Sequence, residues 1–355
     1  MSEARLLEKL RGLIRANGPM SVAEYMAHCL SDPEDGYYTT RDPFGAAGDF
    51  VTAPEVSQMF GEIIGAWLVE VWQRLGAPGP VSLVDLGPGR GTLMADLLRV
   101  ARRAPDFFRA ASVHLVETSP TLRQRQADTL GQSGADVIWH TDFNDVPDGP
   151  LLLVANEFFD ALPIRQFVRL DTWRERVVGL DPRNRLVFGI GPGVLESPVE
   201  APHGSVLEVR PAADAVVAAI AARIAARGGA ALVIDYGHPE TAPGETFQAV
   251  RGHTFADPLA APGVTDLTAH VDFAALARAA RREGAAVRGP MPQGEFLMAL
   301  GLAERAGRLG AGAESAARAA IRAAVERLAG PDQMGTLFKV LALTPPGLIP
   351  PPFGE

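Results

Sequence analysis

Short apolar runs alternate with amphipathic helical patterns through the middle of the chain. The apolar runs predict strands at residues 81–86, 113–116, 137–139, 151–155, 230–234 and 335–343. The helical patterns predict helices at 92–103, 120–132 and 270–282. Strands that alternate with helices are typical of a parallel, doubly wound α/β sheet. Ligands bind to such sheets at the carboxyl ends of the strands, near the point where the strand order reverses.

The N-terminal region has a different pattern. Residues 1–30 and 55–76 show helical spacing, and a capping box that begins at Ser21 opens the second helix of the chain. Residues 31–54 are rich in Gly, Pro, Asp and aromatic side chains, which predicts a long ordered loop. We therefore predict an N-terminal helical lid over residues 1–77.

Two segments interrupt the alternation of strands and helices. The first is a predicted β-rich insertion over residues 165–225, with strands at 165–170, 174–179 and 185–190. The second is an Ala-rich helical pair over residues 293–330, divided around Gly310-Ala311-Gly312. The α/β core is then expected in two parts, at 78–164 and 226–345, and a tail follows at 346–355. The expected fold class is a Rossmann-like α/β sheet with a helical N-terminal lid and two insertions.

Composition narrows the classes of partner and location. The chain has 355 residues and a formal net charge of -9, which disfavours general binding to nucleic-acid phosphates and suits a basic partner. No apolar stretch reaches the ~18 residues of a membrane-spanning helix. The N-terminus has no apolar signal region, and Glu3 and Glu8 disfavour a mitochondrial presequence, so we expect a cytoplasmic protein. Cys29 is the one cysteine and is expected to be buried, and no metal site is expected.

Three glycines with the spacing G-x-G-x-G follow the strand at 81–86. Gly87, Gly89 and Gly91 let the backbone turn sharply and approach a ligand, and the next helix begins with free N–H groups. A dinucleotide enzyme would use G-x-G-x-x-G, whereas the observed spacing is the methyltransferase pattern. We therefore assign Asp85 and the three glycines to binding of S-adenosyl-L-methionine, with a turn that binds no ligand as the alternative.

Further candidates lie at the ends of the next two strands. Glu117, followed by Thr118, can accept hydrogen bonds from both ribose hydroxyls of a nucleoside, and a helix cap is its alternative role. Asp142 and Phe143 are candidates for holding the adenine amino group and packing against the ring. Asp142 has the alternative role of a turn residue.

Polar and acidic residues follow the fourth strand. Amino-methyltransferases place Asn/Asp-Pro-Pro-Tyr/Phe there, and Asn156 and Phe159 fit the first and fourth places of that pattern. Carboxylates suit a guanidinium, and its pKa above ~12 requires a base during methyl transfer. We predict Glu157 as the guanidinium clamp and proton acceptor, Asn156 as an orienting acceptor that also contacts the cofactor, and Phe159 as an aromatic wall.

Two other residues are candidates for the same pocket. Asp160 supplies a second carboxylate, and His238 closes the fifth strand. The alternative for the acidic residues is pairing with nearby arginines such as Arg165. The alternative for His238 is a structural role.

Longer motifs extend over most of the chain and resemble the MidA-type methyltransferases, whose mitochondrial members assist assembly of respiratory complex I. The motifs lie at residues 21–26, 35–38, 48–62, 86–93, 156–163, 235–238 and 262–273. The resemblance implies symmetric dimethylation of an arginine on a complex I subunit. It also implies that Gly48, Asp49 and Phe50 fold over the cofactor as part of the lid.

Other functions remain open from the sequence. One is a non-catalytic assembly chaperone that retains the S-adenosylmethionine site, and another is a small-molecule N-methyltransferase. A nicotinamide dehydrogenase is disfavoured by the glycine spacing. The expected partner is a protein with an exposed arginine, and a homodimer is left open.

Overall fold

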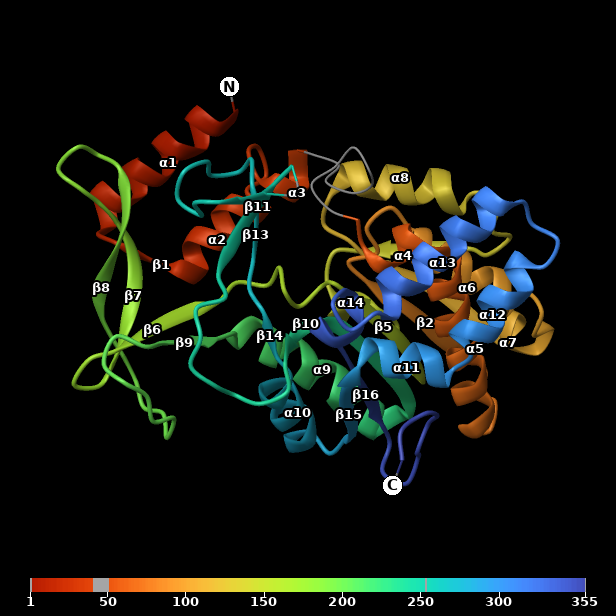
Figure 1. Ribbon diagram of the computed structural model, residues 1–355. Helices are drawn as coiled ribbons and strands as arrows, with labels where there is room; N and C mark the ends of the chain where they lie inside the picture. The colour runs from red at the N-terminus through yellow and green to blue at the C-terminus, as the bar shows by residue number, and fades with distance from the viewer. Residues whose placement is uncertain (1, 41–50, 253, 355) are drawn as a thin grey trace. The chain divides into compact units, whose positions relative to one another are not determined.

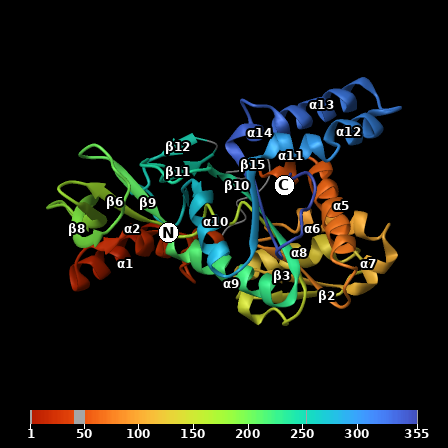
Figure 2. The same cartoon turned by 90° about the horizontal axis from the view of Figure 1, so that it is seen from below.

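The computed structural model describes residues 2–40, 51–252 and 254–354, which form two compact units (Figure 1 and Figure 2). The first unit draws on Met1–Phe50, Asp160–Asp214 and Glu240–Asp272, and the second on Val51–Phe159, Ala215–Pro239 and Phe273–Glu355. The chain therefore passes between the units several times. Helices α4 (Ala53–Val56) and α5 (Gln58–Arg74) belong to the second unit, so the lid predicted over residues 1–77 does not form one separate body.

A mostly parallel sheet forms the centre of the second unit. Its strand order is β15-β16-β10-β5-β2-β3-β4, and β16 runs antiparallel to both of its neighbours. The predicted doubly wound sheet is thus confirmed. The strands are β2 (Val81–Leu86), β3 (Ala111–Val116), β4 (Val137–His140), β5 (Leu151–Asn156), β10 (Gly229–His238), β15 (Ala286–Pro292) and β16 (Phe338–Thr344). Because β3 and β4 continue outward from β2 and the later strands from β5, the order reverses between β2 and β5.

Helices pack on this sheet through its buried alternate positions. Leu83 of β2 and Leu152 of β5 share a buried cluster with Trp67 of α5 and Leu97 of α6 (Thr92–Ala101). Helix α10 (Phe273–Arg282) contacts β10, β15 and β16. Alternate strand residues point to the same face, which explains this grouping. The remaining helices are α7 (Pro105–Ala110), α8 (Pro120–Leu130), η1 (Phe143–Asp145) and α9 (Pro211–Arg227). The β-rich insertion predicted over 165–225 is wrong at its end, because α9 is an Ala-rich helix.

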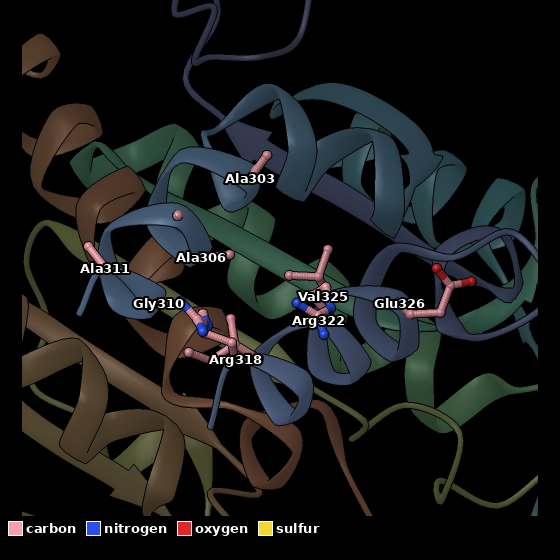
Figure 3. A pocket seen from close by; sticks show the side chains of 10 residues that line it. Ala303, Ala306, Gly310, Ala311, Arg318, Arg322, Val325 and Glu326 are labelled. Atoms are coloured by element: carbon pink, nitrogen blue, oxygen red, sulfur yellow. The ribbon is translucent and has the colours of Figure 1, made fainter. Parts of the chain in front are cut away.

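The second insertion contains three helices where a pair was predicted. They are α11 (Gln293–Ala299), α12 (Leu302–Gly310) and α13 (Ser315–Ala329), and α14 (Met334–Leu337) occupies the start of the predicted last strand. Gly301, with φ 92°, separates α11 from α12. A cavity of about 570 Å³ lies between α12 and α13 (Figure 3). None of the predicted site residues lines it.

The described residues of the first unit form three helices and two small sheets. Its elements are α1 (Ser2–Asn17), β1 (Met20–Ser21), α2 (Val22–Ser31), α3 (Tyr37–Thr40), β6 (Arg165–Arg169), β7 (Trp173–Leu180), β8 (Leu186–Leu195), β9 (Val206–Val209), β11 (Gln248–Arg251), β12 (Thr254–Ala256), β13 (Asp266–Thr268) and β14 (Val271–Asp272). One sheet has the order β1-β7-β6-β9 with β8 beside β7, and the other the order β12-β11-β13. The predicted capping box is confirmed, since the Ser21 hydroxyl accepts from the Glu24 N–H and Glu24 accepts from the Ser21 N–H.

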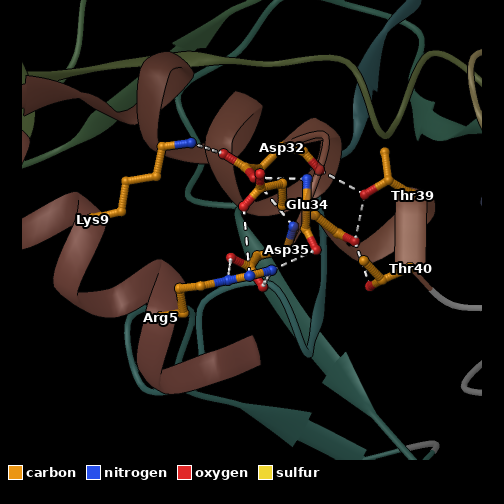
Figure 4. A network of polar contacts seen from close by, with 8 residues as sticks. Arg5, Lys9, Asp32, Glu34, Asp35, Thr39 and Thr40 are labelled. Carbon is orange, nitrogen blue, oxygen red and sulfur yellow. Dashed lines mark hydrogen bonds and ion pairs between the residues drawn. The ribbon is translucent and has the colours of Figure 1, made fainter. Parts of the chain in front are cut away.

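Ion pairs attach α1 to the turn after α2 (Figure 4). Arg5 donates two hydrogen bonds to the Asp35 carboxylate, which is 2% exposed, and Lys9 pairs with Asp32. The Tyr38 hydroxyl donates to Asp266 at 2.9 Å. The motifs at 35–38 and 262–273 are therefore in contact within the first unit, where they stabilise its packing.

Candidate functional site

The glycine-rich turn after β2 has the backbone conformation that its sequence predicts. Gly87, Gly89 and Gly91 have φ angles of 63°, 55° and 82°, which favour glycine. A Cβ atom at Gly87 would lie 2.9 Å from Cδ2 of Phe158. Gly91 is the N-cap of α6 and provides no side-chain cap. The turn can therefore approach a ligand closely, and the first N–H groups of α6 lack a side-chain acceptor at the N-cap.

Glu117 follows β3 and is 8% exposed. Its Oε1 accepts from the Ser119 N–H at 2.8 Å, and its Oε2 accepts from Nε2 of Gln126 at 3.2 Å. Burial raises the pKa of Glu117, and these hydrogen bonds oppose that shift. Each carboxylate oxygen has a second lone pair, so Glu117 retains acceptor capacity for hydroxyl groups.

Gln126 of α8 connects Glu117 to the glycine-rich turn and was not predicted from the sequence. The side chain is 0% exposed. Its Nε2 also donates to the Gly89 carbonyl at 2.8 Å, and its Oε1 accepts from Nε1 of Trp139 at 2.9 Å. A signal was present in the sequence, because Gln126 lies four residues from a leucine on either side and so occupies the apolar stripe of its helix.

Asp85, the penultimate residue of β2, is buried with 1% exposure. Its Oδ2 has no hydrogen-bond partner among the described residues. Burial, and then the charge of Glu117, raise the pKa of Asp85 to about 8. Asp85 is therefore mostly protonated at neutral pH, and its role as a cofactor contact stays a prediction.

The loop after β5 begins with Asn156 and Glu157. The Glu157 Oε1 accepts from the backbone N–H of Ala53 at 3.0 Å and from Nδ2 of Asn156 at 3.1 Å. Its own N–H donates to the Ile234 carbonyl of β10 at 2.9 Å. Glu157 has φ 51°, a left-handed conformation that costs a non-glycine residue on the order of 1 kcal/mol. The Asn156 Oδ1 is buried and has no hydrogen-bond partner among the described residues.

The structure corrects the role predicted for Phe159. This ring is 0% exposed, and the Phe159 N–H donates to Oδ2 of Asp235 at 3.0 Å. A ring buried in the interior cannot form the wall of a substrate pocket. Phe158 is instead half-buried and packs edge-on against Phe159, with ring centroids 5.2 Å apart. Phe158, which contacts the turn at Gly87, is therefore the better aromatic candidate.

Asp160 and His238 are the two remaining candidates for the substrate pocket. Asp160 is buried, and its carbonyl accepts from the Ala269 N–H at 3.2 Å. His238 is the last residue of β10 and is half-buried. The pocket roles of both residues stay predictions.

The adenine candidates form a local turn. Asp142 is exposed, and its Oδ1 accepts from the Asn144 N–H at 2.8 Å, as expected of a turn residue. The Phe143 ring is buried, and the guanidinium of Arg223 lies 5.7 Å from its centroid. The adenine contact stays a prediction, as does that of the exposed Thr118. Residues Gly48, Asp49 and Phe50 lie outside the described residues.

Two further observations concern the described residues as a whole. No group of three or more His, Cys, Asp or Glu side chains among them could hold a metal ion. None of their helices combines the length and the apolar character needed to cross a bilayer.

Comparisons with known proteins agree with this architecture. A family model for S-adenosyl-L-methionine-dependent methyltransferases matches residues 63–291. The protein arginine methyltransferase NDUFAF7 of Danio rerio is 38% identical over 366 residues, which cover 95% of this chain and 86% of the relative. The protein of the same name from Homo sapiens is 38% identical over 369 residues, covering 96% of this chain and 83% of the relative.

A crystal structure supports the same assignment. A Burkholderia thailandensis protein bound to S-adenosyl-homocysteine superposes with a TM-score of 0.87 and 28% identity, covering 97% of this chain and 92% of that one. The Rossmann-like methyltransferase fold and the cofactor predicted from the sequence are thereby confirmed. The chain belongs to this family of S-adenosyl-L-methionine-dependent methyltransferases.

Proposed function

We propose that this methyltransferase methylates an arginine side chain of a protein, and that Glu157 binds the guanidinium group. The observation that carries the proposal is the placement of the Glu157 carboxylate at the end of β5, beside the reversal of strand order. The left-handed backbone of Glu157 is maintained by hydrogen bonds on both its N–H and its carboxylate. Strained conformations that are over-determined in this way cluster at functional sites.

The residues around the glycine-rich turn fit S-adenosyl-L-methionine. The glycines with positive φ angles let the protein backbone come close to the methionine part of the cofactor. The carboxylate of Glu117 suits the ribose hydroxyls. The oxygens of Asp85 and Asn156 that have no partner among the described residues suit N–H donors of the cofactor or of the substrate. When bound, the cofactor supplies an activated sulfonium methyl group.

The protein must then orient a guanidinium nitrogen and accept its proton. The planar guanidinium forms strong hydrogen bonds to carboxylates, so Glu157 can both hold it and accept the proton released as the N–CH₃ bond forms. The Asn156 Oδ1 accepts a second N–H, which orients the group. Phe158 supplies the aromatic surface for a cation–π contact.

The name of the curated relatives, protein arginine methyltransferase, supports arginine as the acceptor. A complex I subunit as target, symmetric dimethylation, a cytoplasmic location and a homodimer stay predictions. A non-catalytic chaperone and a small-molecule N-methyltransferase remain the alternative functions. The Glu157 carboxylate, which can act as a base, lies beside the buried amide oxygen of Asn156, and this pairing favours a catalytic over a purely structural role.

The test is transfer of a labelled methyl group from S-adenosyl-L-methionine to proteins of a cell lysate, followed by mass spectrometry of the labelled residues. Glu157→Gln serves as the inactive control, and calorimetry measures cofactor binding separately. Methylarginine that forms only with the wild-type protein supports the proposal. Cofactor binding without any labelled product indicates the chaperone, and label confined to small molecules indicates the third function. Either result overturns the proposal.

A further inference from the structure

We propose that Gln126 is a positioning residue that holds the carboxylate of Glu117 in register with the glycine-rich turn, and thereby determines how tightly the cofactor ribose is bound. The proposal rests on the assignment of Glu117 to the ribose. Gln126 touches neither the reacting atoms nor the substrate in this role, because it acts through Glu117 and Gly89.

The amide of Gln126 can adopt only one orientation. Its Nε2 faces two acceptors, the Gly89 carbonyl at 2.8 Å and Oε2 of Glu117 at 3.2 Å, and its Oε1 faces the indole N–H of Trp139 at 2.9 Å. If the amide were flipped, an oxygen would face two acceptors and an NH₂ group would face a donor. Both amide donors and one lone pair are therefore used in a single arrangement that joins α8, β4, the end of β3 and the turn.

The second oxygen of the Glu117 carboxylate is restrained separately. The Ser119 N–H donates to Oε1 at 2.8 Å, while Gln126 donates to Oε2. Because each oxygen accepts a hydrogen bond, the plane of the carboxylate is defined, and the lone pairs point in fixed directions. A bidentate contact to two ribose hydroxyls requires such a fixed plane.

Packing alone does not explain a glutamine at this position. The neighbours of Gln126 on the same face of α8, Leu122 and Leu130, are buried apolar residues, and a leucine would continue that stripe. Burying an amide costs free energy unless all of its polar atoms are paired. The Gln126 Cα also lies 3.5 Å from the position that a Cβ of Gly91 would take, so this part of α8 packs closely on the turn. The amide is in this way placed to couple the turn to Glu117.

The experiment compares two ligands by calorimetry, S-adenosylhomocysteine and its analogue without the ribose 2′-hydroxyl. For Gln126→Leu we expect roughly tenfold weaker binding of S-adenosylhomocysteine, because a hydrogen bond to a charged group has about this effect. We expect a much smaller change for the analogue, since it makes less use of Glu117. Gln124→Leu is the matched control, because Gln124 lies on the same helix, is exposed and donates to Asp128. It should bind both ligands as the wild-type protein does.

A purely structural role predicts a different result. If Gln126→Leu weakens both ligands by the same factor, or neither, the positioning role is wrong. Trp139→Phe removes the donor that orients the amide, and we expect about threefold weaker binding of S-adenosylhomocysteine with the analogue again less affected. This variant decides the matter should Gln126→Leu fail to fold. If the wild-type protein binds the two ligands equally well, the assignment of Glu117 to the ribose is wrong. If both variants prefer S-adenosylhomocysteine over the analogue as strongly as the wild-type protein does, only the proposal for Gln126 is wrong.

Discussion

The carboxylate of Glu157 accepts a hydrogen bond from the backbone N–H of Ala53, at 3.0 Å. Ala53 is the first residue of α4, and Glu55 of the same helix accepts from the Thr92 hydroxyl at 2.6 Å. Helix α4 is therefore attached both to the loop after β5 and to the start of α6. A residue proposed to bind substrate is thus also part of the contact that locates α4.

Glu157→Gln should separate these two roles. The amide oxygen of glutamine can still accept from Ala53, but the negative charge and the base are lost. We expect methyl transfer to fall by about a hundredfold or more, with cofactor affinity unchanged. Single-turnover label transfer and calorimetry measure the two quantities. An equal loss of both would mean that Glu157 serves cofactor binding or folding instead. Glu157→Ala, which also removes the acceptor for Ala53, should lower thermal stability in addition.

Alanine substitutions in the glycine-rich turn should differ with position. Gly87 and Gly91 both have positive φ angles, so alanine at either position costs about 1 kcal/mol in backbone strain. A Cβ at Gly87 would also lie 2.9 Å from the Phe158 ring, whereas a Cβ at Gly91 meets its nearest neighbour at 3.5 Å. We expect Gly87→Ala to lower the free energy of unfolding more than Gly91→Ala, by roughly 1 kcal/mol or more. Urea denaturation compares them, and equal losses would contradict the close contact.

Asp85 should make the protein less stable as the pH rises. Its pKa in the folded protein is about 8, against an ordinary value of 3.8, so the folded state holds one more proton between these limits. The stabilisation is complete below pH ~4 and is lost as the pH rises to about 8, with a slope of up to ~1.4 kcal/mol per pH unit. Asp85→Asn should flatten this dependence. The free energy of unfolding, measured from pH 5 to 9, tests this, and identical slopes for both proteins would refute it.

The contact between α5 and α12 should contribute to stability. Arg305 donates two hydrogen bonds to the buried carboxylate of Glu62, which also pairs with Arg99. Removing one partner of a buried ion pair is destabilising, and because Arg99 remains we expect Arg305→Met to cost about 1–3 kcal/mol. Arg308→Met is the control, because Arg308 is exposed and has no ion pair among the described residues. Thermal unfolding that does not distinguish the two variants would show that this ion pair contributes little.

Burial raises the pKa of the Glu62 carboxyl, whereas the two arginines lower it. The arginines have the larger effect, so the pKa lies below its ordinary value of 4.5. The stabilisation from Glu62 is therefore present above pH ~4.5 and is lost as the pH falls through the folded-state pKa. The difference between Arg305→Met and the wild-type protein should accordingly shrink in acid. A difference that stays constant to the lowest pH at which the protein is folded would indicate that Arg305 acts through packing alone.

The alternation of apolar runs and helical patterns was sufficient to predict the parallel sheet, because each element is encoded locally. Strand β2 was predicted to the residue, and β5 to within one residue. Parallel strands end at the same edge of a sheet, so Glu117 and Asn156 could be assigned to that edge without coordinates. The glycine spacing identified the turn, because a backbone with a positive φ angle, such as that of Gly87, favours glycine whatever surrounds it.

Contacts between residues distant in sequence decided the rest. Asp235 accepts from the Phe159 N–H and the Phe159 ring is buried, whereas Phe158 is only half-buried. No local sequence pattern distinguishes the two phenylalanines in this way. The left-handed backbone of Glu157 likewise depends on Ile234 and Ala53. Each of the two units also depends on distant contacts, because it is built from segments that are far apart in the sequence and pack together within that unit. Local sequence determined which elements form and where the glycine-rich turn lies, whereas tertiary packing decided which side chains face the site.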